Sequence, residues 1–127
     1  MITLLYIEVI AMLRIDNNNN IFLTKGDSGI INIKLDSTPA GYDVMEFYVR
    51  QAQNLDNVLI SIVQGVSSEY GQIAYDDNTG IYTLTIFKAA TENMKRRSYV
   101  YDFKLSGTNV VTTFIGGDVS KNQFIVT

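Results

Sequence analysis

Carboxylates are the residues best suited to chemistry in this chain. It holds nine Asp and four Glu but no His and no Cys. The commonest general base and zinc ligand is therefore missing, as are thiolate nucleophiles and disulfides. Catalysis by paired acids needs a cleft that drives two pKa values apart, whereas most of these acids fall in predicted turns or on outer strand faces. We predict a non-enzymatic protein with no catalytic residue, no metal and no cofactor.

Two short clusters could still bind a ligand. Asp76, Asp77 and Asn78 bear oxygens, but a calcium loop needs acids at alternating positions and a distant Glu. Adjacent acids diverge, so we expect a hairpin turn that closes on Gly80. Residues 25–27 (KGD) resemble an adhesion tripeptide. We expect a tight turn there, in which Asp27 bonds to nearby backbone N–H groups.

Positive charge is concentrated in one place, at Lys95, Arg96 and Arg97, with Lys88 nearby. The chain as a whole is mildly acidic, with a formal net charge of −3 and a sequence pI of about 4.7. Nucleic-acid binding needs clustered Lys and Arg, so we expect no nucleic-acid partner. The cluster is predicted to be a solvated crossover loop, and contact with an acidic protein partner is the alternative reading.

A pattern with a period of two dominates the chain. It predicts β-strands, and these strands would position the charged groups named above. Apolar and polar residues alternate strictly in several runs, which places side chains on opposite faces of a strand. The runs are rich in Val, Ile, Thr, Tyr and Phe, as strands prefer. Clean strands are predicted at residues 31–35, 45–50, 82–86 and 99–105, and less regular ones at 58–63, 72–75, 110–115 and 123–127.

Turn residues separate these runs. Residues 16–20 (DNNNN) predict a hairpin loop, because Asn tolerates left-handed backbone. Further turns are predicted at 25–29, 39–41, 76–80 and 106–109. The only break in period is at residues 88–97, where we expect one helical turn, capped near Thr91, crossing between two sheets.

Short strands about every ten residues predict an all-β fold. The length of 127 residues suits one domain. We predict an immunoglobulin-like antiparallel β-sandwich of seven to nine strands over residues 12–127. Tyr99 lies where the chain enters a late strand, the place of a tyrosine corner.

The first eleven residues are strongly apolar and precede the regular pattern. Glu8 interrupts them, no Lys or Arg comes before them, and the run is too short to span a membrane. We predict an extra strand or a protein-contacting arm; a targeting signal and an internal start at Met12 are the alternatives. Candidate partner contacts in the arm are Ile2, Leu4, Tyr6 and Val9, joined by the outer-face aromatic Tyr48.

Several strings resemble a family of phage tail and baseplate proteins. Residues 21–29 (IFLTKGDSG) match an opening of the form hydrophobic-x-Leu-Thr-Arg/Lys-Gly-Asp-Ser/Thr. Residues 99–105 (YVYDFKL) match a recurrent Tyr-x-Tyr-Asp-hydrophobic-x-Leu strand, and 80–86 (GIYTLTI) and 123–127 (QFIVT) fit the same pattern. Over residues 12–127 the chain resembles the N-terminal immunoglobulin-like domain of baseplate upper proteins of tailed phages that infect Gram-positive bacteria, and small prophage tail proteins.

This resemblance implies a structural role in the virion, after synthesis in the bacterial cytoplasm. It implies other tail or baseplate proteins as partners and a homo-oligomer in the assembly, with no membrane partner and no catalytic residues. Two alternatives stay open. One is a module that binds cell-wall glycan through its tyrosines, and the other is a surface adhesin domain.

Overall fold

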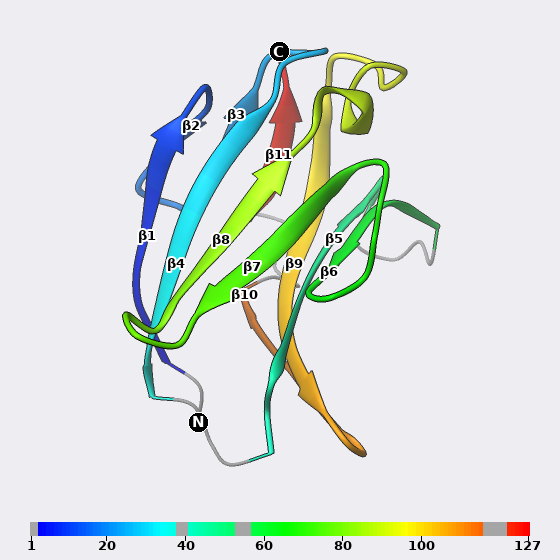
Figure 1. The fold of residues 1–127 in the computed structure, drawn as a ribbon. Coiled ribbons are helices and arrows are strands. Elements are labelled where there is room, and N and C mark those ends of the chain that lie inside the picture. The colour runs from blue at the N-terminus through cyan, green and yellow to red at the C-terminus, as the bar shows by residue number, and fades with distance from the viewer. Residues whose placement is uncertain (1–2, 38–40, 53–56, 116–121) are drawn as a thin grey trace.

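The computed structural model describes residues 3–37, 41–52, 57–115 and 122–127, and these form two packed sheets and one short 3-10 helix (Figure 1). The first sheet has four antiparallel strands in the order β1-β4-β8-β7. Its strands are β1 (Thr3–Ala11), β4 (Gly29–Ser37), β8 (Ile81–Ile86) and β7 (Gly71–Asp76).

The second sheet has seven strands in the order β2-β3-β11-β9-β5-β6. The long strand β9 pairs along one edge with β5, while β11 and β10 share its other edge. The strands are β2 (Arg14–Ile15), β3 (Ile21–Leu23), β11 (Gln123–Val126), β9 (Ser98–Gly107), β10 (Val110–Ile115), β5 (Val44–Arg50) and β6 (Val58–Val63).

The predicted all-β sandwich of immunoglobulin type is confirmed. The order β1-β4-β8-β7 matches the ABED sheet of that fold, and β5, β9 and β10/β11 match its C, F and G strands. Two details differ from the prediction. The described residues hold eleven strands rather than seven to nine, because the N-terminal part divides into three. The β3–β11 pair is parallel, so the sandwich is not wholly antiparallel.

Side-chain alternation along the strands builds the core. β5 and β8 bury every second residue in a regular pattern. Aromatic residues dominate the inner face of the seven-stranded sheet. The Phe47 ring centroid lies 4.9 Å from that of Phe103 and 5.8 Å from that of Tyr101. The inner face of the four-stranded sheet is instead mainly aliphatic, with Ile31, Ile33, Leu84 and Ile86 fully buried.

The N-terminal segment changes sheets at Met12. β1 ends at Ala11 in the four-stranded sheet, and β2 begins at Arg14 in the other. Met12 has a φ of 67°, a left-handed conformation that is uncommon for a long side chain. The predicted hairpin loop then joins β2 to β3, with Asn19 also at positive φ (61°).

The predicted helical crossover is also confirmed. The 3-10 helix η1 (Lys88–Ala90) follows β8 and leads to β9 in the other sheet. Thr91 caps its C-terminal end, and the Thr91 hydroxyl accepts a hydrogen bond from the Gly26 N–H at 2.9 Å. The Tyr99 hydroxyl donates to the Lys95 carbonyl at 2.9 Å, which forms the tyrosine corner.

Candidate interaction surfaces

The apolar N-terminal segment forms β1, an edge strand of the four-stranded sheet. Its pairing partner among the described residues is β4. Irregularities in the register fall at both ends of the strand and leave a regular stretch from Tyr6 to Val9. Leu5 and Ile10, outside this stretch, expose 53% and 51% of their surface, and Val9 exposes 37%. The edge therefore offers apolar side chains to a partner.

The predicted contact residues of this segment differ in burial and in the face of the sheet on which they lie. Leu4 is half-buried and packs against the core. Tyr6 lies opposite Lys34 of β4, on the outer face, and Val9 is opposite the buried Ile31. Ile2 is outside the described residues.

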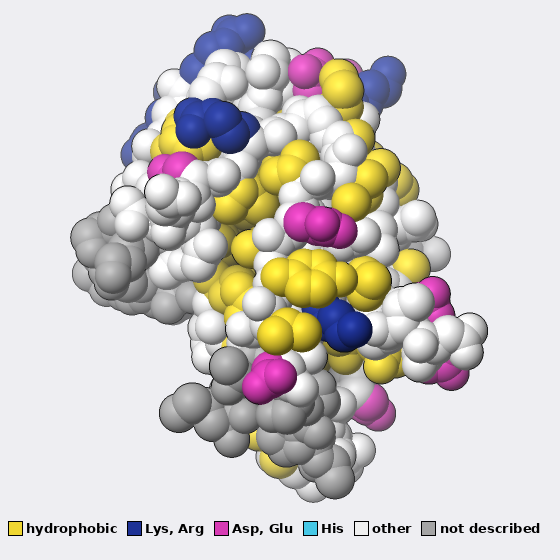
Figure 2. All heavy atoms as spheres, turned by 90° about the vertical axis from the view of Figure 1, so that its left-hand side faces the viewer, with side chains coloured by type: hydrophobic (Ala, Val, Ile, Leu, Met, Phe, Trp, Pro, Cys, Tyr) yellow, Lys and Arg dark blue, Asp and Glu magenta, His cyan; other side chains and the backbone are white. Residues whose placement is uncertain are grey.

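Figure 2 views the molecule from the side on which β1 lies in Figure 1. Hydrophobic side chains form a broken band down this side, with acidic and basic groups set among them. Because protein interfaces combine apolar and polar surface, this side of the molecule is a candidate contact surface for a protein partner.

Tyr48, the predicted outer-face contact, is held in a polar network on the seven-stranded sheet. Its hydroxyl donates to one carboxylate oxygen of Glu46, and the Ser106 hydroxyl donates to the other. The Lys104 ammonium lies 5.7 Å from the centroid of the Tyr48 ring. Burial, and then the adjacent Glu46 carboxylate, raise the pKa of Tyr48 above its ordinary value of 10. The ring is thus half-buried and engaged within the sheet.

The same outer face carries an ion pair. Arg50 Nη2 donates to Asp102 Oδ2 at 2.7 Å, between the adjacent strands β5 and β9. The Asp102 side chain exposes only 6% of its surface and that of Arg50 exposes 20%. A buried carboxylate needs such a partner, because an unpaired charge is costly to remove from water.

The three clustered basic residues all lie exposed between η1 and β9. The Arg97 guanidinium carbon lies 5.5 Å from the Tyr99 ring centroid. Lys95 and Arg97 line a hollow of about 300 Å³ together with Met94 and Leu59, whereas Arg96 does not line it. The structure therefore brings two of the three predicted basic contacts to one concave site.

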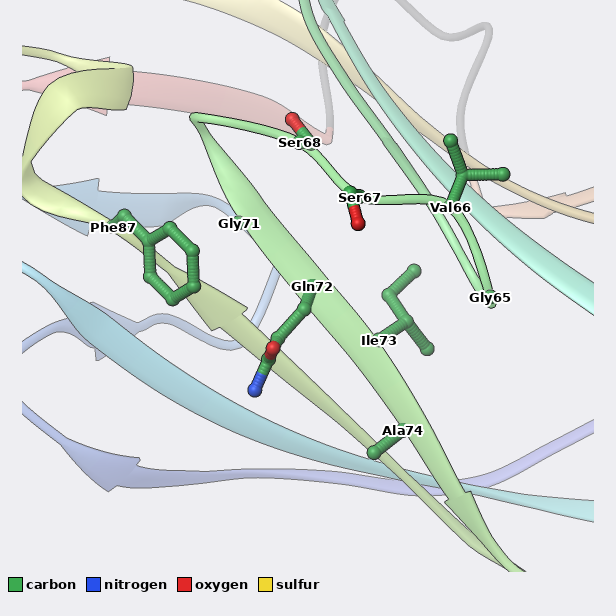
Figure 3. A pocket seen from close by; sticks show the side chains of 9 residues that line it. All are labelled: Gly65, Val66, Ser67, Ser68, Gly71, Gln72, Ile73, Ala74 and Phe87. Atoms are coloured by element: carbon green, nitrogen blue, oxygen red, sulfur yellow. The ribbon is translucent and has the colours of Figure 1, made fainter.

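Sequence reasoning missed a groove beside β7, the opposite edge of the four-stranded sheet (Figure 3). It measures about 450 Å³ and lies between β7 and the loop that leaves β6. Its apolar lining comes from Val66, Ile73, Ala74 and Phe87. One signal in the sequence marks this edge: β7 carries no charged residue from Gly71 to Tyr75.

The acidic cluster at the β7–β8 connection forms the predicted turn. Asp76 Oδ1 accepts from the Asn78 N–H at 2.9 Å, and the Gly80 N–H donates to the Asp76 carbonyl at 2.7 Å. Gly80 takes a φ of 73°. Across the described part of the chain, no three His, Cys, Asp or Glu residues gather closely enough to hold a metal ion.

The described residues also include no helix with the length and apolar character needed to cross a membrane. Comparison of the whole chain with known proteins gives no matching family model and no matching curated protein.

Proposed function

We propose that this protein is a non-enzymatic structural component of a phage or prophage tail or baseplate, and that it works through protein–protein contacts within the virion. The tail-protein motifs at residues 21–29 and 99–105 support this role. In the fold they form β3 with its following turn, and most of β9. Both belong to the scaffold, which is where a resemblance in architecture is expected to lie.

The open edge at β1 is the observation that carries the proposal. Natural edge strands are usually short, charged or covered, since an open edge invites pairing with another chain. β1 is nine residues long, and Glu8 is its only charged residue. Exposed Leu5, Val9 and Ile10 add apolar surface. Pairing of this strand with a neighbouring subunit would give its open backbone N–H and C=O groups hydrogen-bond partners and would bury its apolar side chains.

The alternative role in glycan binding depends on exposed aromatic rings, and most tyrosines in strands do not supply them. Tyr82, Tyr99 and Tyr101 are buried in the core. Tyr75 exposes 45% of its surface, but its ring lies against Tyr82 with centroids 4.4 Å apart. This distribution favours assembly over sugar recognition.

Virions purified from the source strain test the proposal. The chain should be present in intact particles, and gold-labelled antibodies against it should bind at the tail in electron micrographs. Its absence from purified particles while it is abundant in the lysate would refute the tail role. Saturable binding of the isolated chain to cell-wall polysaccharide, together with that absence, would establish the glycan-binding alternative.

A further inference from the structure

Among the described residues, the four-stranded sheet ends in two edge strands, β1 and β7, which run in opposite directions. Each neighbouring pair in the order β1-β4-β8-β7 is antiparallel, so three reversals separate the two edges. A second copy in the same orientation can therefore bring its β1 antiparallel to β7 of the first. We propose that copies of this chain join head to tail in this way, β1 to β7, as the specific form of the assembly contact proposed above.

The backbone of β7 is arranged for such pairing. The Phe87 N–H donates to the Tyr70 carbonyl at 2.8 Å, which sets the phase of the ladder between β7 and β8. Hydrogen-bonded pairs recur at every second residue, so Gln72 and Ala74 bond to β8. The N–H and C=O groups of the residues between them, such as Ile73, point toward the open edge.

The side chains of the two edges are complementary. The apolar lining of the groove beside β7 comes from Val66, Ile73, Ala74 and Phe87, while Ser67, Ser68 and Gln72 add uncharged polar groups; no charged residue lines it. β1 presents exposed Val9, as well as Leu5 and Ile10. An incoming β1 would bury these apolar groups against the groove, where the small side chain of Ala74 leaves room for a larger side chain.

The two faces of the sheet restrict the register. Ile7 of β1 lies opposite the buried Ile33 and so points to the core side, and Ile73 of β7 is buried on that same side. Tyr6 and Ala74 point to the outer side. A register that places Tyr6 opposite Ala74 also places Ile7 opposite Ile73, and Glu8 opposite the amide of Gln72. Both faces then continue from one copy to the next.

Cysteine cross-linking tests this contact, since the natural chain has no Cys. A chain carrying both Tyr6→Cys and Ala74→Cys places two thiols in a pair without mutual backbone hydrogen bonds, with Cα atoms about 4.5 Å apart. Disulfides form readily at that separation. Within one chain, β1 and β7 are separated by β4 and β8, about 14 Å in all, so a bond inside the chain cannot form.

Mild oxidation of this double variant, at the highest concentration that stays in solution, should give a ladder of covalent multimers on a non-reducing gel. The Tyr6→Cys/Ser61→Cys variant is the matched control, because Ser61 is exposed on β6, the edge strand of the other sheet. It should give only the slow background of random collisions. Mass spectrometry of the cross-linked peptides should show a disulfide that joins position 6 of one copy to position 74 of the next.

Three outcomes overturn the proposal. A ladder no faster than that of the control shows that β7 does not receive β1. Rapid dimers of the single Tyr6→Cys variant show that β1 pairs with β1 instead. Rapid cross-linking of the Ser61 control identifies β6 as the acceptor. Presence of the chain in virions without the expected cross-link refutes this contact alone, whereas the cross-link without virion incorporation refutes the tail role alone.

Discussion

The two sheets of this sandwich use apolar residues for different purposes. The seven-stranded sheet buries an aromatic cluster that includes Phe47, Tyr101 and Phe103, each fully buried. The four-stranded sheet ends in β1, where Leu5 exposes 53% of its surface and Ile10 exposes 51%. Burial of large rings stabilises the single chain. Exposed aliphatic residues on an open edge give it little stability, so they are available for a partner.

The largest effect on stability is expected from Phe103→Ala. The Phe103 ring is fully buried, and its centroid lies 4.9 Å from that of Phe47. Removal should lower the free energy of unfolding by about 3–5 kcal/mol. Leu5→Ala on β1 should change it by less than about 0.5 kcal/mol. Urea denaturation measures both free energies. Equal losses would show that Leu5 on β1 stabilises the single chain as much as the buried aromatic cluster does.

Breaking the ion pair on the outer face should have the next largest effect. Asp102→Asn removes the charge that Arg50 contacts at 2.7 Å, in a side chain only 6% exposed. The free energy of unfolding should fall by about 1.5–3 kcal/mol. Asp77→Asn, in the exposed β7–β8 turn, is the matched control and should stay within about 0.5 kcal/mol of the natural protein. An unchanged free energy of unfolding in Asp102→Asn would show that the ion pair adds no stability.

Tyr99→Phe should have a smaller effect. It removes only the hydroxyl that donates to the Lys95 carbonyl at 2.9 Å, and leaves the ring in the core. We expect a loss of about 1 kcal/mol. Thermal unfolding measures this loss. In the same experiment Tyr75→Phe, at a ring that is 45% exposed, should leave the free energy of unfolding nearly unchanged. Equal changes in the free energy of unfolding for the two variants would show that the Tyr99 hydrogen bond does not stabilise the crossover.

The smallest effect concerns the hairpin loop before β3. Asp16 Oδ1 accepts from the backbone N–H groups of Asn20 and Asn18, each at 2.9 Å, and these bonds lower its pKa below 3.8. Because the folded pKa is depressed, its contribution is present above pH 3.8 and disappears as the pH falls through the folded pKa. The melting-temperature difference between the natural protein and Asp16→Asn should therefore shrink on acidification below pH 3.8. A constant difference would contradict this.

Local patterns in the sequence predict much of the fold. Strict alternation locates β5 and β8, and left-handed turn residues such as Asn19 and Gly80 mark hairpins correctly. The helical crossover and the Tyr99 corner are also predictable, because both depend on residues near one another in the chain.

Features that depend on distant pairing are not predictable from these patterns. The parallel contact of β3 with β11 joins Ile21 to Phe124, far apart in the sequence. The same holds for the Arg50–Asp102 pair and for the assignment of β1 and β7 as the edges of one sheet. The groove beside β7 arises from that assignment and from the path of the loop after β6. Candidate contacts on β1 could be named from the sequence, but the groove beside β7 could not.

Assembly through β1 is tested by the mass of the protein in solution, measured by sedimentation equilibrium across a concentration series. Val9→Lys places a charge on the open edge of β1, whereas Val111→Lys makes the same change at an exposed valine on β10 of the other sheet. We predict that the natural chain and Val111→Lys associate with increasing concentration, and that Val9→Lys stays a folded monomer. Equal association of all three proteins would contradict assembly through β1.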